Sequence, residues 1–389
     1  MDLTIQLRSL RGEITIIPSK SQAHRLLICA AFANNETTLI CPETNRDIEA
    51  TIDCLNALGA SILRTEYGYS VDPIPKVPEK AVLNCCESGS SLRFLLPIVG
   101  ALGVDATFHM EGRLPQRPLS PLWEEMERMG CILSRPTANT IHCEGKLKAG
   151  QYTIDGSVSS QYITGLLFAL SLIDGKTSLE ITGKVESKPY IALTKAAMAL
   201  FDAPNYHTPG YLEVEGDWSN GAFFLAANEL GSELSIRGLN QSSVQGDRAI
   251  LTHLEQMRRG NPSISAADIP DLVPIMAIVA AAKHGATFTN IQRLRLKESD
   301  RVATTISMIE SLGGKAESAE EMLIVHGTGL RGGAVNAHND HRIAMAAAIA
   351  ATVCKEPVNI LGAEAVNKSY PKFWDEYRRL GGNYEQHLR

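Results

Sequence analysis

IEATIDCLNALGASIL, residues 48–63, followed by GYSVDP, residues 68–73, is the stretch that decides the fold. Ile52, Leu55 and Leu58 have the spacing of one helix face, and Gly59 follows where a left-handed helix end favours glycine. Two short runs typical of strands come next. The stretch therefore predicts an amphipathic helix followed by two strands.

The same unit recurs along the chain at intervals of about 55 to 70 residues, as in a repeat protein. The further copies are residues 121–145, 192–217, 249–265, 303–327 and 373–386. Three copies in each half predict two similar α/β domains, residues 18–216 and 217–389. We expect the first strand, within residues 1–17, to complete the second domain.

Between the copies lie helices that are too apolar for a protein surface. They span residues 91–103, 160–173, 219–231, 271–285 and 340–353. Each is preceded by polar or small residues suited to capping. We expect these helices to be buried, with strands and amphipathic helices wrapped around them.

Composition excludes several classes of protein. The chain has 389 residues, 44% of them hydrophobic, and a net charge of -6, which argues against a broad nucleic-acid surface. The start has no basic segment followed by an apolar stretch, and no run approaches membrane length. The eight cysteines show no C-x-x-C spacing, and the ten histidines form no H-E-x-x-H pair. We expect a cytoplasmic monomer with no bound metal, no membrane contact and no nucleic-acid partner.

Polar residues gather at the starts of the apolar helices. The five starts are residues 19–25, 87–93, 156–162, 297–301 and 339–342. A helix start carries unpaired N–H groups and about half a positive charge, so it favours phosphate or carboxylate. Cations there oppose the helix dipole, so Lys20, Arg25 and Arg342 require a compensating anion. Serines such as Ser21 and Ser90 are plausible N-caps. Together the starts predict a highly anionic ligand.

Two basic loops and two acids complete the candidates. Arg117 precedes Pro118, a rigid position from which a guanidinium can grip a phosphate or carboxylate, and Lys368 precedes a proline-started helix. Asp271 stands at the start of an almost entirely apolar helix, either as its N-cap or as a general base. Glu298 lies between Lys297 and Arg301.

Ten ordered stretches across nearly the whole chain resemble the enolpyruvyl transferases, and among them the members that use shikimate 3-phosphate. They are SKSQAHR (19–25), ESGSSLR (87–93), LPQRPLSPL (114–122), GSVSSQYITGLL (156–167), ESKPYI (186–191), VEGDWSNGAFFL (214–225), DIPDLVP (268–274), RLRLKESDR (293–301), NDHRIAM (339–345) and NKSYP (367–371). The resemblance implies two domains, each of three βαβαββ repeats around buried helices, an inside-out α/β barrel, with the active site in the interdomain cleft.

The resemblance also implies a reaction without metal or organic cofactor. Phosphoenolpyruvate and shikimate 3-phosphate give 5-enolpyruvylshikimate 3-phosphate and phosphate. Their phosphates and carboxylates would explain the cations at the helix starts. The implied mechanism is addition followed by elimination, which requires one base, one acid and several anion-binding groups.

Site roles follow residue by residue from the matching stretches. The implied catalytic residues are Asp271, Glu298 and Lys20. Phosphoenolpyruvate would bind Lys20, Gly89, Arg117, Gln161, Arg301, Arg342 and Lys368. Shikimate 3-phosphate would bind Lys20, Ser21, Arg25, Ser159, Ser160, Gln161, Ser187, Asp271 and Lys297, with Tyr190 lining that site. Asp271 would accept the proton of the attacking 5-hydroxyl, and Glu298 or Lys20 would carry protons at the methylene carbon.

The sequence departs from the family pattern at three places. Glu87 stands where asparagine is common, Arg293 replaces an asparagine, and residues 256–271 look shortened. Three alternatives are weaker. A UDP-amino-sugar enolpyruvyl transferase normally has Lys-Asn where this chain has Lys20-Ser21. A silent ligand-binding relative would not keep Lys20, Asp271 and Glu298, and an RNA-end cyclase would need a basic face.

Overall fold

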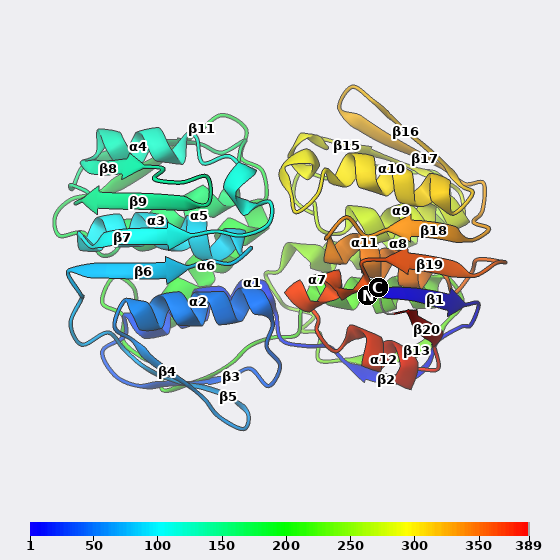
Figure 1. Ribbon diagram of the computed structural model, residues 1–389, viewed down its shortest axis with the longest axis horizontal. Helices are drawn as coiled ribbons and strands as arrows, with labels where there is room; N and C mark the ends of the chain where they lie inside the picture. The colour runs from blue at the N-terminus through cyan, green and yellow to red at the C-terminus, as the bar shows by residue number, and fades with distance from the viewer. Residues whose placement is uncertain (388–389) are drawn as a thin grey trace. The chain divides into compact units, whose positions relative to one another are not determined.

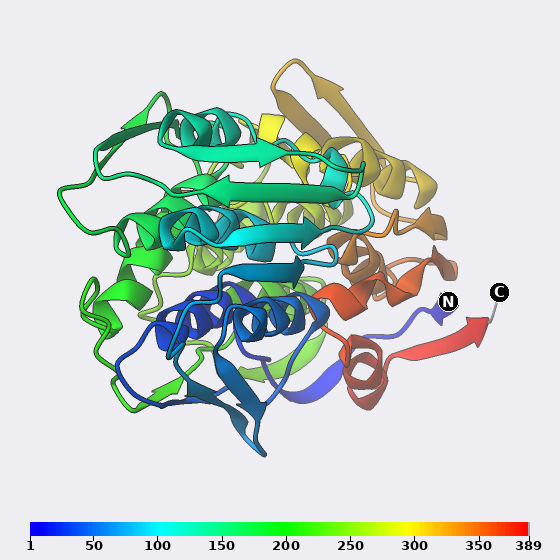
Figure 2. The same cartoon turned by 60° about the vertical axis from the view of Figure 1, so that its left-hand side comes forward.

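The computed structural model describes residues 1–387 and divides into two compact units. The N-terminal unit is Pro18–Val214, and the C-terminal unit joins Met1–Ile17 to the chain from Glu215 onward. The two termini of the C-terminal unit meet in one sheet, because β1 pairs with β20 at Asp2–Gln6 and Asn383–His387. Figures 1 and 2 both show these two strands side by side.

The N-terminal unit alternates helices and short strands. Its helices are α1 (Lys20–Ala31), α2 (Arg46–Ala57), α3 (Gly89–Leu102), η1 (Leu114–Gln116), α4 (Leu122–Arg128), α5 (Ser160–Leu170) and α6 (Lys188–Leu200). Its strands are β3 (Thr37–Ile40), β4 (Ser61–Arg64), β5 (Gly68–Asp72), β6 (Lys80–Asn84), β7 (Asp105–His109), β8 (Cys131–Ser134), β9 (Thr140–Gly145), β10 (Gln151–Asp155), β11 (Ser178–Thr182) and β12 (Tyr211–Glu213).

One sheet pattern recurs in this unit. In the order β6-β7-β9-β8 the first pair is parallel and the next two are antiparallel, and β12-β3-β5-β4 repeats this arrangement. Strand β6 shows why one face is buried, since Ala81 and Leu83 alternate with exposed neighbours. The third repeat is shorter than the βαβαββ pattern. It has the parallel pair β10-β11, and after α6 the chain gives the single strand β12 to the first sheet.

The amphipathic helix expected within residues 48–58 is α2, and it ends as its pattern predicts. Its C-cap is Leu58, and Gly59 follows with φ +105°. A Cβ at Gly59 would lie 3.1 Å from the carbonyl oxygen of Lys76, so both the backbone angle and the space favour glycine. The predicted amphipathic helix and its two strands, β4 and β5, are confirmed.

The C-terminal unit repeats the same elements. Its helices are α7 (Trp218–Glu229), η2 (Gly246–Ala249), α8 (Ile250–Arg259), α9 (Val273–Ala282), η3 (Gln292–Leu296), α10 (Arg301–Ser311), α11 (His341–Ala350), η4 (Ala363–Lys368) and α12 (Phe373–Arg379). Its remaining strands are β2 (Arg11–Thr15), β13 (Glu233–Arg237), β14 (Ser263–Ser265), β15 (Ala286–Thr289), β16 (Lys315–Ala319), β17 (Met322–His326), β18 (Gly333–Asn336) and β19 (Val358–Leu361).

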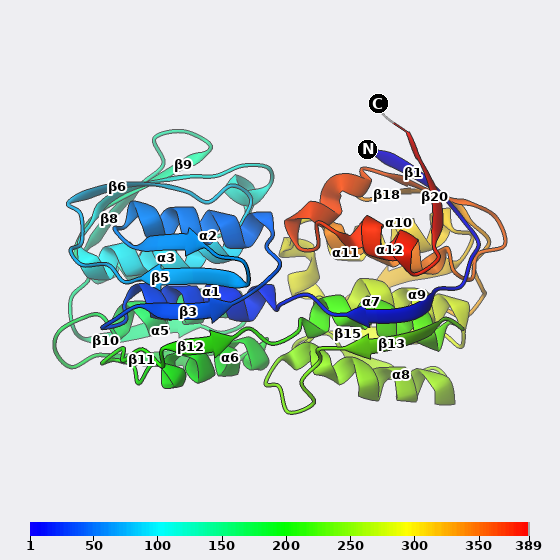
Figure 3. The same cartoon turned by 90° about the horizontal axis from the view of Figure 1, so that it is seen from below.

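The amino-terminal strands complete two sheets of this unit. The order β14-β15-β17-β16 repeats the pattern above, and in β18-β19-β1-β20 strand β1 takes the third place. Strand β2 pairs in parallel with β13, and Figure 3 shows it beside α7 and β13. The first strands therefore belong with the second half of the chain.

The predicted buried helices form the interior of each unit. In the C-terminal unit α9 is buried from Val273 to Ala281, and every residue of α11 is buried. In the N-terminal unit α3 is buried except at Ser90 and Leu102 and packs against α5. Polar residues at the starts of such helices therefore stand at the ends of apolar cores. Among residues 1–387, every helix falls short of what crossing a bilayer requires.

Candidate active site

The first residues of α1 bring two cations close to a helix start. Ser19 is the N-cap and accepts from the backbone N–H of Gln22 at 3.4 Å, so the serine expected to cap, Ser21, lies inside the helix. The ammonium of Lys20 lies 2.8 Å from a carboxylate oxygen of Asp47 on α2. The anion that Lys20 requires is thus supplied, at least in part, by the protein.

Arg25 is a buried cation with only neutral partners among the described residues. Its guanidinium donates to the Thr194 hydroxyl at 2.8 Å, the Ser21 carbonyl at 2.6 Å and the Tyr190 carbonyl at 3.2 Å. The side chain is only 3% exposed, and burial lowers the pKa of Arg25 to about 10, which still leaves it protonated at neutral pH. A buried charge without a counter-ion is costly, so this position favours an anionic ligand.

The start of α3 is surrounded by guanidinium groups. A Cβ on Gly89, the first residue of the helix, would lie 2.6 Å from an Nη atom of both Arg93 and Arg117. The Nε of Arg117 is buried and has no hydrogen-bond partner. The N-cap is Ser88 rather than Ser90. Glycine at position 89 therefore lets two cations approach the helix N-terminus, which is the arrangement that binds phosphate or carboxylate.

Gln161 connects α5 to this group. Its amide accepts from Arg93 at 3.2 Å and donates to the hydroxyl of Ser90 at 3.1 Å. Ser159 caps α5 by accepting from the backbone N–H of Gln161, and Ser160 is the buried first residue of that helix. Arg93 is a candidate site residue that the sequence reasoning missed, although an arginine within the apolar run 91–103 was its visible signal.

The remaining candidates of the N-terminal unit lie before and within α6. Ser187 is 1% exposed and has a left-handed backbone, φ +55°. Tyr190 contributes its carbonyl to Arg25. Glu87, the departure from the family pattern, packs against Gly112, where a Cβ would touch its carboxylate. Helix starts α1, α3, α5 and α6 therefore carry every candidate of this unit except Arg117, whose loop reaches Gly89.

Asp271 is the centre of the cluster in the C-terminal unit. Its carboxylate lies 2.5 Å from Arg301, 3.5 Å from Lys297 and 3.5 Å from Arg342. Burial alone would raise the pKa of Asp271, but these three cations together hold it well below its ordinary value. The interpretation of Asp271 as an N-cap is wrong. Helix α9 begins at Val273, its N-cap position is Leu272, and no side chain caps it.

Arg301 holds the acids of this cluster in place. It is 1% exposed and donates to Asp340 at 2.9 Å and to Glu298 at 2.7 Å, in addition to Asp271. Asp340 is fully buried, caps α11 through the N–H of Arg342 and also accepts from Ser299. A substrate anion can bind Arg301 only by sharing it with, or displacing, one of these carboxylates.

Arg342 has donors that the acids do not use, and Lys368 bonds to a backbone carbonyl. The Nε and one Nη of Arg342 are buried without a partner, and its guanidinium stands 5.9 Å from the Phe223 ring. The ammonium of Lys368 donates to the carbonyl of Asn339 at 2.8 Å, a neutral acceptor. Lys297 lies beside Asp271, and burial lowers its pKa. The cluster thus joins cations that suit anionic substrates to a carboxylate that suits a base.

Asp247 is a buried acid that no sequence pattern marked as a candidate. One oxygen accepts from the Ser219 hydroxyl, and the other has no partner. Burial, and then the charge of Asp271, raises the pKa of Asp247 to about 7. No group of three or more His, Cys, Asp or Glu side chains suited to a metal ion occurs within residues 1–387.

Comparison with known proteins gives a consistent result. The family model for EPSP synthase (3-phosphoshikimate 1-carboxyvinyltransferase) matches residues 5–377. The 3-phosphoshikimate 1-carboxyvinyltransferase of Clostridium kluyveri is 38% identical over 418 aligned positions, covering 99% of this chain and 98% of the relative. That of Clostridium beijerinckii is 37% identical, with the same coverage of both chains. These alignments are longer than this chain, so the relatives contain residues without a counterpart here.

Solved structures agree on the fold. An EPSP synthase structure from Acinetobacter baumannii matches with a TM-score of 0.78 at 22% identity, covering 99% of this chain and all of that one. A second structure of EPSP synthase from the same organism matches with a TM-score of 0.79 at 21% identity. The expected fold class, mixed α/β with repeated units, is confirmed.

Proposed function

This chain belongs to the EPSP synthase family and transfers the enolpyruvyl group of phosphoenolpyruvate to shikimate 3-phosphate, and we propose that the two clusters described above divide this work. The reaction is a step of the shikimate pathway to aromatic amino acids. It requires groups that hold several negative charges and groups that move two protons. The cluster in each unit supplies some of the groups that hold negative charge and some of those that move protons.

The shikimate 3-phosphate site is proposed from the N-terminal ends of α1, α5 and α6. Ser21, Arg25, Ser159, Ser160, Gln161 and Ser187 bind this substrate, together with Lys20 and with Lys297 and Asp271 from the C-terminal unit. The observation that carries this assignment is Arg25, a buried guanidinium whose partners are all neutral oxygens among the described residues. A phosphate or carboxylate beside it would supply the missing charge.

The phosphoenolpyruvate site is proposed from the start of α3 and from three cations of the C-terminal unit. Gly89 and Arg117 bind it from one unit, with Gln161 and Lys20, and Arg342, Lys368 and Arg301 from the other. Gly89 supports this assignment because only a residue without a side chain leaves Arg93 and Arg117 at the helix start. The donors of Arg342 that lack partners support it from the C-terminal unit.

The proposed chemistry is addition followed by elimination. The 5-hydroxyl oxygen bonds to C2 of phosphoenolpyruvate, its proton passes to Asp271, and C3 takes a proton from Lys20 or Glu298. The bond from C2 to the phosphate oxygen then breaks, phosphate leaves, and C3 loses a proton so that the double bond reforms. Asp271 becomes a stronger base when substrate anions draw Arg301 and Arg342 away from it.

The setting of the enzyme is also part of the proposal. It acts in the cytoplasm as a monomer, needs neither metal nor organic cofactor, and binds no nucleic acid. These statements rest on the composition of the chain and on its family. Sedimentation of the purified protein tests the oligomeric state, and activity retained in the presence of a chelator tests independence from metal.

A phosphate-release assay tests the activity. The purified chain is given phosphoenolpyruvate with shikimate 3-phosphate, with UDP-N-acetylglucosamine, or with no acceptor. We expect phosphate only with shikimate 3-phosphate, and loss of most activity in Arg25→Met. Phosphate release with the UDP-sugar alone would overturn the substrate assignment, and full activity in Arg25→Met would overturn the role of Arg25.

A further inference from the structure

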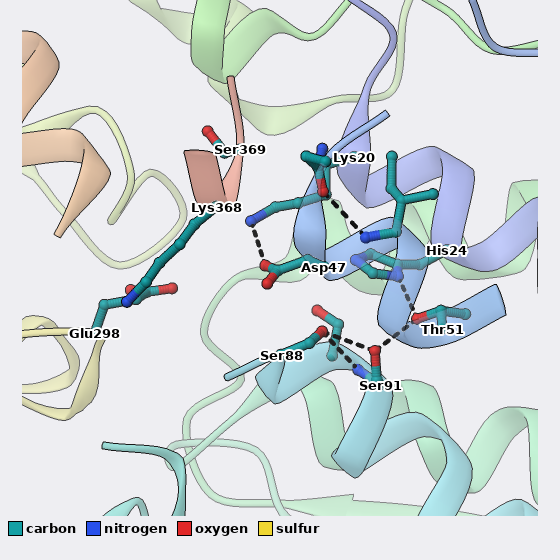
Figure 4. A network of polar contacts seen from close by, with 12 residues as sticks. Lys20, His24, Asp47, Thr51, Ser88, Ser91, Glu298, Lys368 and Ser369 are labelled. Atoms are coloured by element: carbon teal, nitrogen blue, oxygen red, sulfur yellow. Dashed lines mark hydrogen bonds and ion pairs between the residues drawn. The ribbon is translucent and has the colours of Figure 1, made fainter. Parts of the chain in front are cut away.

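Four side chains connect three helices of the N-terminal unit in a line of hydrogen bonds (Figure 4). His24 on α1 lies 2.7 Å, Nδ1 to Oγ1, from Thr51 on α2. The Thr51 hydroxyl lies 2.6 Å from that of Ser91 on α3, and Ser91 donates to the Ser88 hydroxyl at 2.8 Å. All four residues are essentially inaccessible to solvent. The line therefore runs through the interior from the second turn of α1 to the N-cap of α3.

Counting hydrogens fixes the direction of every bond in this line. A hydroxyl has one hydrogen, and that of Ser91 is given to Ser88. Thr51 must then donate to Ser91, which leaves it only an acceptor for His24. The Nδ1 of His24 consequently carries the hydrogen. In a neutral imidazole the other nitrogen, Nε2, is then a bare acceptor.

The surroundings of His24 keep the ring neutral. It is 1% exposed, its Nε2 is buried and has no partner among the described residues, and the Phe94 ring of α3 meets it edge-on at 6.4 Å. Burial, and then the charges of Lys20 and Arg25 on the same helix, lower the pKa of His24 well below its ordinary value. Asp47 of α2 is the acid nearby, and its carboxylate is bound to Lys20.

The two ends of the line coincide with the two proposed substrate sites. On α1, His24 lies between Lys20, one turn earlier, and Arg25, the next residue. On α3, Ser88 accepts from the N–H of Ser91 at 3.2 Å and so caps the helix that begins with Gly89. A change in the side-chain conformation of His24 would therefore be transmitted through three hydrogen bonds to Ser88, the N-cap beside Gly89.

We propose that His24, as the neutral Nδ1–H tautomer, is a positioning residue that couples the shikimate 3-phosphate site on α1 to the phosphoenolpyruvate site on α3. This inference rests on the proposed function for the identity of the two substrates. Staying neutral leaves the charges of Lys20 and Arg25 for the substrates, while the Nδ1–H bond holds Thr51, Ser91 and Ser88 in one arrangement. His24 itself touches neither substrate.

Kinetics of matched variants test the coupling. His24→Asn places an amide near the position of Nδ1 and should retain wild-type KM values. His24→Leu and Thr51→Val break the line and should raise the KM for phosphoenolpyruvate about five- to tenfold, the scale of one lost hydrogen bond, with kcat little changed. Thr37→Val is the control, because it removes the hydroxyl of another buried threonine of the same unit, which bonds at 2.7 Å to the half-buried Thr208.

The outcomes separate positioning from plain stability. The proposal predicts that Thr37→Val lowers the thermal midpoint but leaves both KM values unchanged. The proposal would be overturned if Thr51→Val and Thr37→Val had the same KM for phosphoenolpyruvate. It would also be overturned if this KM were as high in His24→Asn as in His24→Leu. If wild-type protein releases no phosphate, the proposed function itself has failed.

Nitrogen NMR of the full chain tests the tautomer without any activity. With labelled histidine, the His24 signals are assigned by their disappearance in His24→Asn. We expect a protonated Nδ1, a bare Nε2 and no titration between about pH 5.5 and pH 8, across the ordinary histidine range. A bare Nδ1 with a protonated Nε2 would contradict the direction of the hydrogen bonds, and an imidazolium at neutral pH would contradict the neutral ring; either result would overturn the proposal.

Discussion

Asp271 owes its properties to the three cations around it. With Arg301, Lys297 and Arg342 in place, its pKa is held well below the ordinary value, so the free enzyme presents a weak base. Substrate phosphates and carboxylates compete for the same cations. We therefore expect the basicity of Asp271 to rise when both substrates are bound.

Asp271→Asn tests this role. An amide keeps the shape of the side chain and can still accept hydrogen bonds from Arg301, but it cannot take the hydroxyl proton. We expect kcat to fall by about 10²- to 10⁴-fold, the usual contribution of a general base. Calorimetric titration with shikimate 3-phosphate should show binding largely retained. Lost binding together with lost kcat would instead identify Asp271 as a substrate-holding residue.

Asp247 makes a prediction about pH. Its pKa is raised from 3.8 to about 7 in the folded protein, chiefly by burial. Between about pH 4 and pH 7 the unfolded chain has lost this proton and the folded chain keeps it, so stability falls as pH rises. The slope from this one group is on the order of 1.4 kcal/mol per pH unit.

Asp247→Asn should remove that slope. The neutral amide can still accept from Ser219, and it does not ionise. Urea unfolding of both proteins at pH 5, 6, 7 and 8 measures the difference directly. We expect the variant to gain stability relative to the wild type as pH rises. A difference that is constant across this range would show that Asp247 is already ionised in the folded state.

Arg25 shows what residue-level sequence reasoning can and cannot supply. A position in a first turn predicted that it needs an anion, but α1 begins at Lys20 and Arg25 lies in the second turn, so the need arises from burial among neutral oxygens. Its partners Thr164, Tyr190 and Thr194 lie 139 to 169 residues away in the chain, so no local pattern could name them. Asp247 had no such local signal, because its pKa arises from burial.

At the scale of elements, helices α10 and α11 start with the same kind of residue in different settings. Asp300 caps α10 and is partly exposed. Asp340 caps α11, is fully buried and also holds Arg301 at 2.9 Å. The second aspartate therefore joins two helix starts through a buried ion pair, while the first caps its own helix and binds only the half-exposed Arg295.

The two alanine variants should differ accordingly. Asp340→Ala loses a cap and leaves a buried guanidinium partly uncompensated, which costs about 3–5 kcal/mol of unfolding free energy. Asp300→Ala loses a cap and a half-exposed ion pair with Arg295, together about 1–2 kcal/mol. Chemical denaturation of the pair gives both values. Equal losses would mean that the Arg301 pair adds no stability beyond capping.

Element types were easier to predict than element ends. The apolar runs predicted α3, α5, α7, α9 and α11, because a helix that is buried on all sides is apolar all round. The caps were misplaced at Ser21 and Ser90, since Ser19 and Ser88 are equally suitable residues two positions earlier. The prediction that Asp271 is an N-cap was wrong for a different reason. Its carboxylate binds Arg301, which lies thirty residues away in the chain.

At the scale of the whole molecule, the N-terminal unit is continuous in sequence and closes its own sheets. Strands β3 to β12 pair only with one another among the described residues. The apolar core of this unit is drawn from residues 23–214. The C-terminal unit is different, because β1 and β2 complete two of its sheets.

This difference predicts how pieces of the chain behave. A fragment of residues 18–214 should fold and melt cooperatively, because its sheets and core need nothing from outside. A fragment that starts at residue 215 should not, because β19 and β20 would lose the strand between them. Circular dichroism melts of both fragments check this. A structureless 18–214 fragment would show that the units depend on each other for folding.

The repeat pattern was visible in the sequence because each copy must bury its own helix face. What escaped it was the shortened third repeat of the N-terminal unit. The third copy, residues 192–217, has the same sequence pattern as the others. Only the pairing of β12 with β3 shows that its end supplies a single strand to the first sheet.

The most direct measurement is the reaction run in heavy water with both substrates, followed by phosphate analysis and mass spectrometry of the product. Addition of a proton to C3 and its later loss predict one phosphate per product, with deuterium at the enolpyruvyl methylene carbon. Asp271→Asn should form neither at a comparable rate. Product without deuterium would contradict addition and elimination, and phosphate formed without product would contradict enolpyruvyl transfer itself.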